Sequence, residues 1–385
     1  MLPLATTTWD DKELDALKKV MDSGMFTMGK YVKEFELAFA EFVGSKFCVM
    51  VNSGSSANLL AIAALVYCKE NALKPGDEVI VPAVSWSTTY YPLYQHGLKL
   101  KFVDIDDKTL NLNLEQLASA ISDKTRAIFA VNLLGNPLDY GRLNEIIAGK
   151  DIIVVEDNCE SLGATFNGKQ AGTFGVIGTY STFFSHHIST MEGGMLVTDN
   201  EEFYHIMLSM RSHGWTRHLP TENRVCTKSN DAFLESFRFV LPGYNLRPLD
   251  MSGALGLEQI EKLPSIISGR RKNAEVFKSL FSDIPGLSIQ TETGESSWFG
   301  FALLANDINK RDELVKKLSN SGVECRPIVG GNFIRNPVVQ YFDHDIHNQL
   351  TNSDRVSDCG LFIGNHHFDI VQKLESIAAT VRSVL

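Results

Sequence analysis

The stretch STFFSHHISTMEGG, residues 181–194, holds residue types that can carry acid–base chemistry. A run that begins at Ser181 ends in the adjacent pair His186 and His187, and a Glu-Gly-Gly turn follows. Imidazole exchanges protons readily at neutral pH because its ordinary pKa is about 6.5. A lone histidine is usually structural, whereas two histidines directly after a predicted strand favour a reactive site without proving one.

The segment VNSGSSANLL, residues 51–60, has the pattern of a phosphate-binding turn. A predicted strand runs into Gly54, Ser55 and Ser56, and a predicted helix begins there. Free backbone N–H groups and the dipole at a helix N-terminus attract phosphate, and glycine lets the anion approach closely. An ordinary serine cap explains the same residues, so both interpretations stay open at this point.

Three more candidates follow predicted strands. Trp86, in VSWSTTYYP (84–92), could stack on a flat heteroaromatic ring or pack in the core or at an interface. Asp157 follows the apolar run 152–155 and could pair with a protonated ring nitrogen or cap a turn. Glu160 lies three residues further on and could face the same ligand.

Short β-rich runs recur along the first part of the chain, and helix-compatible segments separate most of them. The runs are 46–51, 77–82, 98–105, 126–132, 151–157, 179–184 and 193–199. This alternation predicts an α/β fold with a mostly parallel sheet covered by helices, and ligands bind beyond the carboxyl ends of such strands. After about residue 250 a helical stretch leads to a second, α+β unit. We predict a large domain over 1–250 and a smaller C-terminal domain over 251–385.

Composition and charge narrow the function classes. The net charge is −10 and no basic block occurs, which argues against nucleic acid as a partner. No apolar run approaches the roughly 20 residues of a membrane span, and the N-terminus lacks the features of a secretory signal. The six cysteines are scattered, so no metal or iron–sulfur ligand set is visible. These features predict a cytoplasmic protein without a metal site or a membrane partner.

The order of the candidates along the chain resembles the DegT/DnrJ/EryC1/StrS family of pyridoxal-phosphate-dependent sugar aminotransferases. Members typically show a strand-end Glu-Asp, a Gly-x-x-Gly stretch, then Ser-Phe, and a lysine five residues before Gly-Glu-Gly-Gly. This chain reads Glu156-Asp157, GKQAGTFG (168–175), YSTFFSHH (180–187) and MEGG (191–194). The resemblance covers nearly the whole chain and implies the aspartate-aminotransferase-like fold, known as fold type I.

The chain departs from the family at the lysine. The lysine position, counted back from Met191, falls on His186, and no lysine occurs between Lys169 and Lys228. In the family this lysine binds the cofactor covalently and moves a proton at its C4′ carbon. Histidine cannot hold the cofactor covalently, but it can still move the proton. The resemblance therefore implies pyridoxal phosphate or pyridoxamine phosphate bound noncovalently.

One branch of the family, the nucleotide-sugar 3-dehydratases, shares the His-His pair before MEGG and the segments 25–29, 82–92, 212–217 and 241–245. The resemblance implies loss of the C3 hydroxyl of GDP-4-keto-6-deoxymannose or a close analogue, which gives a 3,6-dideoxy-4-keto sugar. L-Glutamate would restore pyridoxamine phosphate. His186 would be the catalytic base.

The same resemblance implies a set of residues that bind the cofactor. These residues are Gly54, Ser55, Trp86, Asp157, Glu160, Ser181 and Asn245. Asn245 would reach the cofactor phosphate of the neighbouring subunit, which implies a homodimer with shared active sites.

Two other functions stay open. A plain aminotransferase would give the sugar an amino group, and the missing lysine argues against it. A catalytically inactive family member would tolerate the loss of lysine. An inactive protein would have no need to keep all the residues of a cofactor site. The retained candidate residues therefore argue against an inactive protein. The choice of GDP rests on the resemblance alone.

Overall fold

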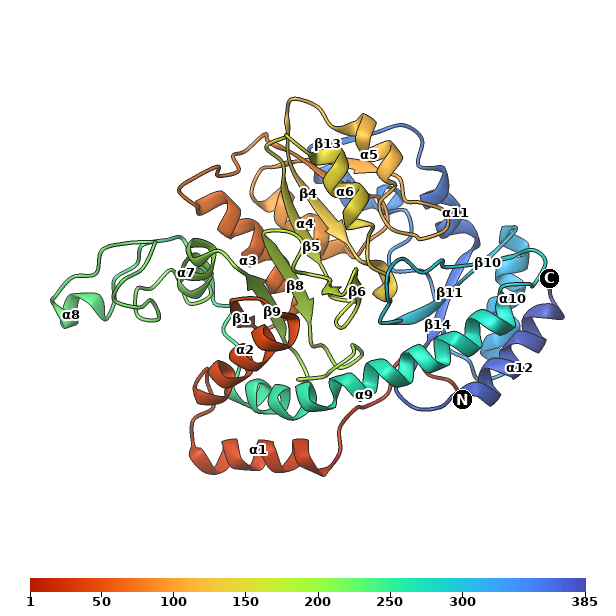
Figure 1. The fold of residues 1–385 in the computed structure, drawn as a ribbon, viewed down its shortest axis with the longest axis horizontal. Helices are drawn as coiled ribbons and strands as arrows, with labels where there is room; N and C mark the ends of the chain where they lie inside the picture. The colour runs from red at the N-terminus through yellow and green to blue at the C-terminus, as the bar shows by residue number, and fades with distance from the viewer.

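An eight-stranded sheet forms the centre of the computed structural model, which describes residues 1–385 (Figure 1). Its strands lie in the order β1-β9-β8-β5-β4-β2-β3-β13. They are β1 (Phe47–Val51), β2 (Glu78–Pro82), β3 (Lys99–Val103), β4 (Thr125–Val131), β5 (Ile153–Asp157), β8 (Ile177–Ser181), β9 (Gly194–Thr198) and β13 (His344–Ile346). The pairs from β8 to β13 are parallel, and β9 runs antiparallel to both β1 and β8. The predicted mostly parallel sheet is confirmed.

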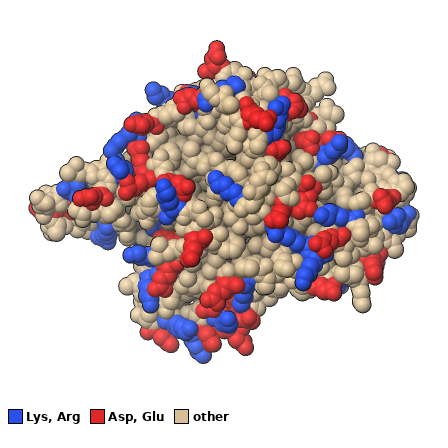
Figure 2. All heavy atoms as spheres, in the orientation of Figure 1, with Lys and Arg blue, Asp and Glu red and all other residues tan.

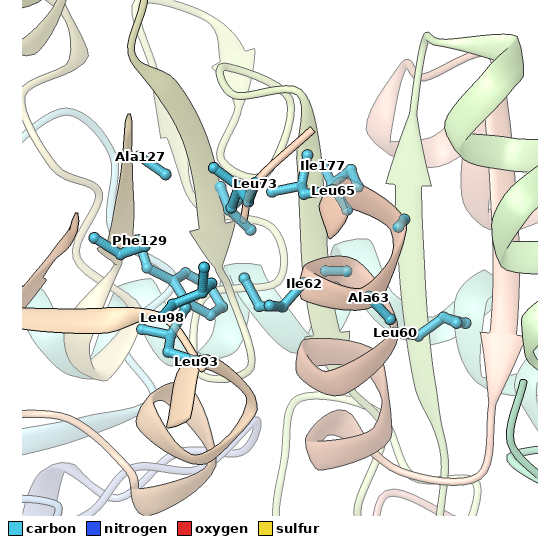
Figure 3. Close-up of a cluster of buried hydrophobic side chains, with 14 of the residues drawn as sticks. Leu60, Ile62, Ala63, Leu65, Leu73, Leu93, Leu98, Ala127, Phe129 and Ile177 are labelled. Atoms are coloured by element: carbon cyan, nitrogen blue, oxygen red, sulfur yellow. The ribbon is translucent and has the colours of Figure 1, made fainter. Parts of the chain in front are cut away.

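Helices cover both faces of this sheet. On one face lie α3 (Gly54–Tyr67), α4 (Ser87–Gln95) and α7 (Glu201–Met210), and on the other lie α5 (Leu114–Ala120) and α6 (Tyr140–Ile147). Residues 127–131 of β4 are apolar and are packed on both faces. Phe129 shares a core with Ile62 of α3 (Figure 3), whereas Ile128 packs with Leu117 and Leu143. A strand buried on both faces needs apolar residues at every position.

The remaining face of β1, β9 and β8 is covered by α2 (Lys30–Val43) and the long helix α9 (Asp250–Phe281). Helix α1 (Asp11–Ser23) packs against α9 and not against the sheet. Phe35 and Phe39 of α2 share a core with Tyr180 and with Ile266 of α9. Further along α9, Phe277 belongs to a second core, so this helix joins the two halves of the molecule.

The second core lies under a four-stranded antiparallel sheet in the order β10-β11-β14-β12. Its strands are β10 (Leu287–Ile289), β11 (Gly300–Ala305), β12 (Cys325–Arg326) and β14 (Gly360–Gly364), and the helices nearby are α10 (Ile308–Asn320), α11 (Thr351–Cys359) and α12 (Val371–Arg382). This is the smaller α+β unit expected from the sequence. Strand β13 returns from this part of the chain to the large sheet. The division at residue 250 stays a prediction.

One predicted strand differs from the structure in a way that matters for the site. The run 179–184 was expected to be extended throughout, but β8 ends at Ser181. Thr190 N–H donates to the Thr182 carbonyl (2.9 Å), and the two hydroxyls lie 2.6 Å apart. This closed pairing turns the chain, so residues 182–190 form a loop that we call the histidine loop.

An extended arm, residues 212–245, projects from the large sheet domain and carries the short helix α8 (Ala232–Glu235) at its far end (Figure 1). Several of its apolar side chains face solvent in this chain, namely Phe233, Leu234, Phe237 and Phe239. Acidic and basic side chains are interspersed over the face of the molecule drawn in Figure 2. None of the helices combines the length and apolar character needed to cross a membrane.

Candidate active site

A cavity of about 390 Å³ opens beyond the carboxyl ends of β1, β2, β4, β5 and β8. The predicted site residues that line it are Gly54, Ser55, Trp86, Asp157, Glu160, Ser181 and His186. They come from separate segments of the chain, and they meet because the ends of neighbouring parallel strands share one edge of the sheet. Asn245 does not line this cavity.

The N-terminus of α3 forms the floor of an anion site. Ser53 caps the helix by accepting the Ser56 N–H (3.1 Å), so the first free N–H groups and the helix dipole face the cavity. A Cβ on Gly54 would lie 2.7 Å from Cβ of Ser181, which shows how closely the two segments approach. The Ser55 hydroxyl is exposed and lies 3.0 Å from the Thr88 hydroxyl. Hydroxyls and backbone donors thus converge at one point, as phosphate binding requires.

Asp157 is held rigidly at the end of β5, with a side chain that is buried in the wall of the cavity. Its Oδ2 accepts hydrogen bonds from Asn58 Nδ2 and the Thr89 hydroxyl, both at 2.8 Å, and its Oδ1 accepts the Cys159 N–H at 3.1 Å. Asn58 is fixed in turn because its Oδ1 accepts the Thr179 hydroxyl (2.6 Å). A carboxylate has more acceptor sites than these donors fill, so Asp157 can also accept a cationic N–H from a ligand.

Glu160 lies in the same wall but in different surroundings. Burial raises the pKa of Glu160 to about 7, the hydrogen bond from the Leu134 N–H (2.9 Å) opposes this shift, and the negative charge of Asp157 adds to it. Glu160 can therefore donate a proton near neutral pH.

Trp86 precedes the first turn of α4 and its side chain is 59% exposed at the rim of the cavity. Trp86 is therefore not packed in the core of its own chain, and the alternative that it packs at an interface stays open. An exposed indole beside the anion site offers a flat apolar face to a ring that enters the cavity.

The two histidines have different surroundings in the histidine loop. His186 lines the cavity beside Phe299, with ring centroids 5.2 Å apart, and its Nδ1 has no partner in the protein. His187 is buried outside the cavity, and its Nε2 lies 3.1 Å from the Ser297 carbonyl oxygen. Burial and the positive charge of Arg270 lower the pKa of His186 to about 4. The imidazole is therefore neutral at pH 7 and can accept a proton.

Asn245 lies at the base of the arm and is exposed. Its Oδ1 accepts a hydrogen bond from Nε of Arg247 (3.0 Å). Within one chain it serves no part of the cavity, so its contact with a cofactor phosphate stays a prediction.

Several lining residues were not found from the sequence. Asn58 and Thr88 follow Gly54 and Trp86 by a turn or less, so helical spacing could have indicated them. Phe299 and Val329 also line the cavity. They come from the C-terminal part of the chain, and nothing in their local sequence indicates that they approach the strand ends.

Comparison with known proteins places the chain in a family. A family model described as the DegT/DnrJ/EryC1/StrS aminotransferase family matches residues 7–381. The chain belongs to this family. The GDP-4-keto-6-deoxy-D-mannose 3-dehydratase of Yersinia pseudotuberculosis is 59% identical over 379 residues, which span 97% of this chain and 96% of that protein.

Solved structures agree with this assignment. A crystal structure of GDP-4-keto-6-deoxymannose-3-dehydratase with a trapped PLP-glutamate geminal diamine has a TM-score of 0.97 and 57% identity, covering 99% of this chain and 100% of that one. A mutant of that enzyme with bound GDP-perosamine gives the same values. The fold-type-I architecture expected for the family is confirmed.

Proposed function

We propose that this member of the family is a nucleotide-sugar 3-dehydratase that uses pyridoxamine phosphate and acts on GDP-4-keto-6-deoxymannose. The observation that carries the proposal is His186, which lines the cavity while no lysine lines it. Without a lysine beside the cofactor, a family member cannot bind the cofactor covalently. A histidine at that position can still act as a base. The similar 3-dehydratases described above support the same reaction and substrate.

The residues of the cavity fit pyridoxal phosphate and pyridoxamine phosphate. The N-terminus of α3, with Gly54, Ser55 and Ser181, would bind the phosphate. Trp86 would cover one face of the ring. Asp157, already fixed by three donors, would hold the ring nitrogen in its protonated form.

When bound, pyridoxamine phosphate would supply an amine for the C4 ketone of the sugar and a ring that accepts electrons. Neutral His186 would take a proton at the C4′ carbon, which its low pKa permits at pH 7. The imidazolium that results can return a proton to the leaving C3 hydroxyl. Glu160, with its pKa near 7, is a second donor in the cavity wall.

The overall reaction balances with L-glutamate as co-substrate. The sugar exchanges its C3 hydroxyl for hydrogen, and glutamate is converted to 2-oxoglutarate and ammonia. The structure of a similar enzyme with a PLP-glutamate geminal diamine supports glutamate as the amino donor. The mutant complex with GDP-perosamine supports a GDP-sugar substrate.

We infer further that the protein acts as a homodimer in which the arm of one subunit completes the site of the other. The exposed side chains of Phe233, Phe237 and Phe239 favour coverage by a second subunit. Asn245 lies at the base of this arm, outside the cavity of its own chain. The six cysteines are all free, which supports a cytoplasmic location.

The test is product analysis with purified protein, GDP-4-keto-6-deoxymannose, pyridoxal phosphate and L-glutamate. We expect a sugar product lighter than the substrate by one oxygen atom, with one 2-oxoglutarate formed for each sugar. An amino sugar would instead identify a plain aminotransferase. Borohydride reduction of the pyridoxal-phosphate form should leave no label on the protein, and a phosphopyridoxyl-lysine peptide from the cavity would contradict noncovalent binding.

A further inference from the structure

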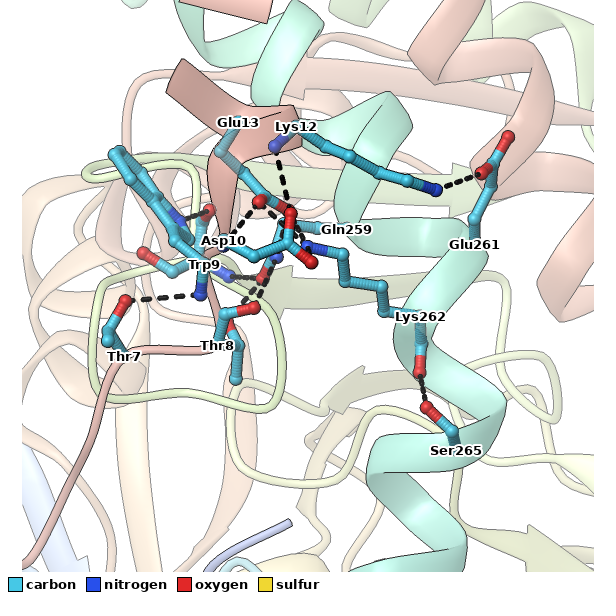
Figure 4. Close-up of polar contacts among 11 residues, drawn as sticks. Thr7, Thr8, Trp9, Asp10, Lys12, Glu13, Gln259, Glu261, Lys262 and Ser265 are labelled. Atoms are coloured by element: carbon cyan, nitrogen blue, oxygen red, sulfur yellow. Dashed lines mark hydrogen bonds and ion pairs between the residues drawn. The ribbon is translucent and has the colours of Figure 1, made fainter. Parts of the chain in front are cut away.

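The histidine loop is held from outside the cavity by the N-terminal segment and by α9. Figure 4 shows the polar contacts that join this N-terminal segment to Gln259 and Lys262 of α9. Nε1 of Trp9 donates to the carbonyl oxygen of Ser189 (2.9 Å), and the Ser189 N–H donates to Oε1 of Gln259 (3.0 Å). Both backbone polar groups of Ser189 are thus bound by side chains that are distant in the sequence. Ser189 is buried and lies three residues after His186.

A buried carboxylate determines how Gln259 is oriented. Glu13 is fully buried near the start of α1, and both of its oxygens accept hydrogen bonds from Nζ of Lys262 at 2.7 Å. Glu13 also accepts a hydrogen bond from Nε2 of Gln259 at 2.6 Å. A carboxylate can only accept, so the amide must turn its NH₂ group toward Glu13. Its oxygen then faces the Ser189 N–H and the Thr8 hydroxyl.

This arrangement matters for His186 because its ring is held mainly by packing against aromatic side chains. Nδ1 of His186 has no partner in the protein, and the ring contacts are aromatic neighbours. Its direction therefore depends on where the backbone of the loop is anchored. One anchor is the Thr182–Thr190 pairing at the base of the loop, and another is the contact of His187 with Ser297. Ser189 is the third.

We propose that Trp9, Gln259 and Glu13 are positioning residues, which hold Ser189 so that the His186 imidazole points at the reacting atoms. The proposal rests on the proposed function, in which His186 moves the proton. A displacement of about 1 Å in a reacting group can cost on the order of 10²-fold in rate. The N-terminal segment would then contribute to turnover although it does not line the cavity.

The test compares three full-length variants with a matched control. Trp9→Phe keeps a ring and removes the donor, Gln259→Leu removes the acceptor for Ser189, and Glu13→Gln removes the charge that fixes the amide. The control is Lys12→Ala. Lys12 and Glu261 form an exposed ion pair (4.0 Å, side chains 62% and 70% exposed) between the same two helices, without contact to Ser189.

We measure kcat and KM for dehydration, the thermal midpoint, and hydrogen–deuterium exchange in peptides that cover 182–193. Each of the three variants should lower kcat by about tenfold or more while KM for the sugar changes by less than about twofold. Exchange should rise in the histidine loop and stay unchanged in β4 and β5. Lys12→Ala should match the wild-type protein in all of these measurements.

The proposal is overturned if kcat per folded molecule is unchanged, so that total activity falls only in proportion to the folded fraction. It is also overturned if exchange in the histidine loop matches the wild type. If the wild-type protein itself performs no dehydration, the proposed function fails. Hydrogen–deuterium exchange alone then tests whether these residues hold the histidine loop. Unchanged exchange at 182–193 in Trp9→Phe and Gln259→Leu overturns that part of the proposal.

Discussion

At the scale of single residues, one cavity holds two carboxyl groups that differ in the number of hydrogen bonds they accept. Asp157 accepts three hydrogen bonds from fixed donors, whereas Glu160 accepts one, from the Leu134 N–H. Burial raises the pKa of Glu160 to about 7. The base, His186, is shifted the other way, because burial and Arg270 lower its pKa to about 4. At neutral pH the same cavity therefore holds a neutral base and an acid that is partly protonated.

Replacing His186 tests which histidine is the base. His186→Asn keeps a polar side chain but removes the proton acceptor, so we expect dehydration to fall by at least ~10²-fold. Pyridoxamine phosphate should still bind, because its phosphate and ring contact other residues, and absorbance titration measures this. His187→Asn is the comparison. Near-normal turnover in His186→Asn would assign the base elsewhere, first to His187.

Glu160 should leave a signature in the pH dependence of stability. Its folded-state pKa is raised, so the folded protein binds the extra proton and loses stability as pH rises from about 4.5 to about 7. Glu160→Gln has no such loss. The free energy of unfolding of Glu160→Gln, minus that of the wild type, should therefore rise by up to about 3 kcal/mol between pH 4.5 and pH 7. Urea denaturation of the cofactor-free proteins at several pH values measures the difference, and parallel curves would contradict the raised pKa.

At the scale of elements, the site depends on how closely α3 approaches β8 and the segment after β5. A Cβ on Gly54 would meet Cβ of Ser181 at 2.7 Å and the sulfur of Cys159 at 2.9 Å. Neither neighbour is the far end of a flexible side chain. Any side chain at position 54 must therefore displace the helix N-terminus from the strand ends.

Gly54→Ala should for this reason weaken cofactor binding by about tenfold or more and destabilise the protein by about 1–3 kcal/mol. The matched control is Gly141→Ala in the first turn of α6, where the added Cβ meets nothing closer than 3.2 Å. That change should preserve binding. Equilibrium dialysis of pyridoxamine phosphate and thermal unfolding measure both effects. Equal binding by the two variants would show that the close approach of α3 to Ser181 does not matter for phosphate binding.

At the scale of the whole molecule, the arm over 212–245 is the feature that a single chain leaves unexplained. It projects from the body with exposed aromatic side chains (Figure 1), and Asn245 at its base has no place in its own cavity. A second subunit that receives the arm would account for both observations.

Mixing two inactive variants tests this assembly. His186→Asn removes the base, and Asn245→Asp places a negative charge against the cofactor phosphate of the partner. If sites are shared, one site of a mixed dimer carries both defects and the other carries neither. Subunit exchange should then restore activity in up to about a quarter of the sites under random pairing. No recovery, with exchange confirmed by mass spectrometry of tagged subunits, would mean that each chain builds its own site.

Local sequence determined much of this protein. Continuous apolar stretches, such as 127–131 within the run 126–132, predicted buried parallel strands, because only residues apolar on both faces suit a doubly covered sheet. Residue types directly after those runs marked Gly54, Trp86 and Asp157 as candidates, each with a structural alternative, and the family resemblance chose between the alternatives. The missing lysine at position 186 was visible only after the family's motif was matched to the chain, because it depends on spacing from MEGG.

The tertiary structure decided what depends on contacts between distant segments. Phe299, which follows α9 in the chain, lines the cavity. The Ser189 carbonyl accepts its hydrogen bond from Trp9, which is 180 residues away in the sequence. The sequence could not separate His186 from His187 by type. Their difference arises because the Thr182–Thr190 pairing ends β8 at Ser181 and the loop then turns one ring into the cavity and buries the other. Opposite pKa shifts on Glu160 and His186 follow from the same cause, since burial is a property of the packed molecule and of no single segment.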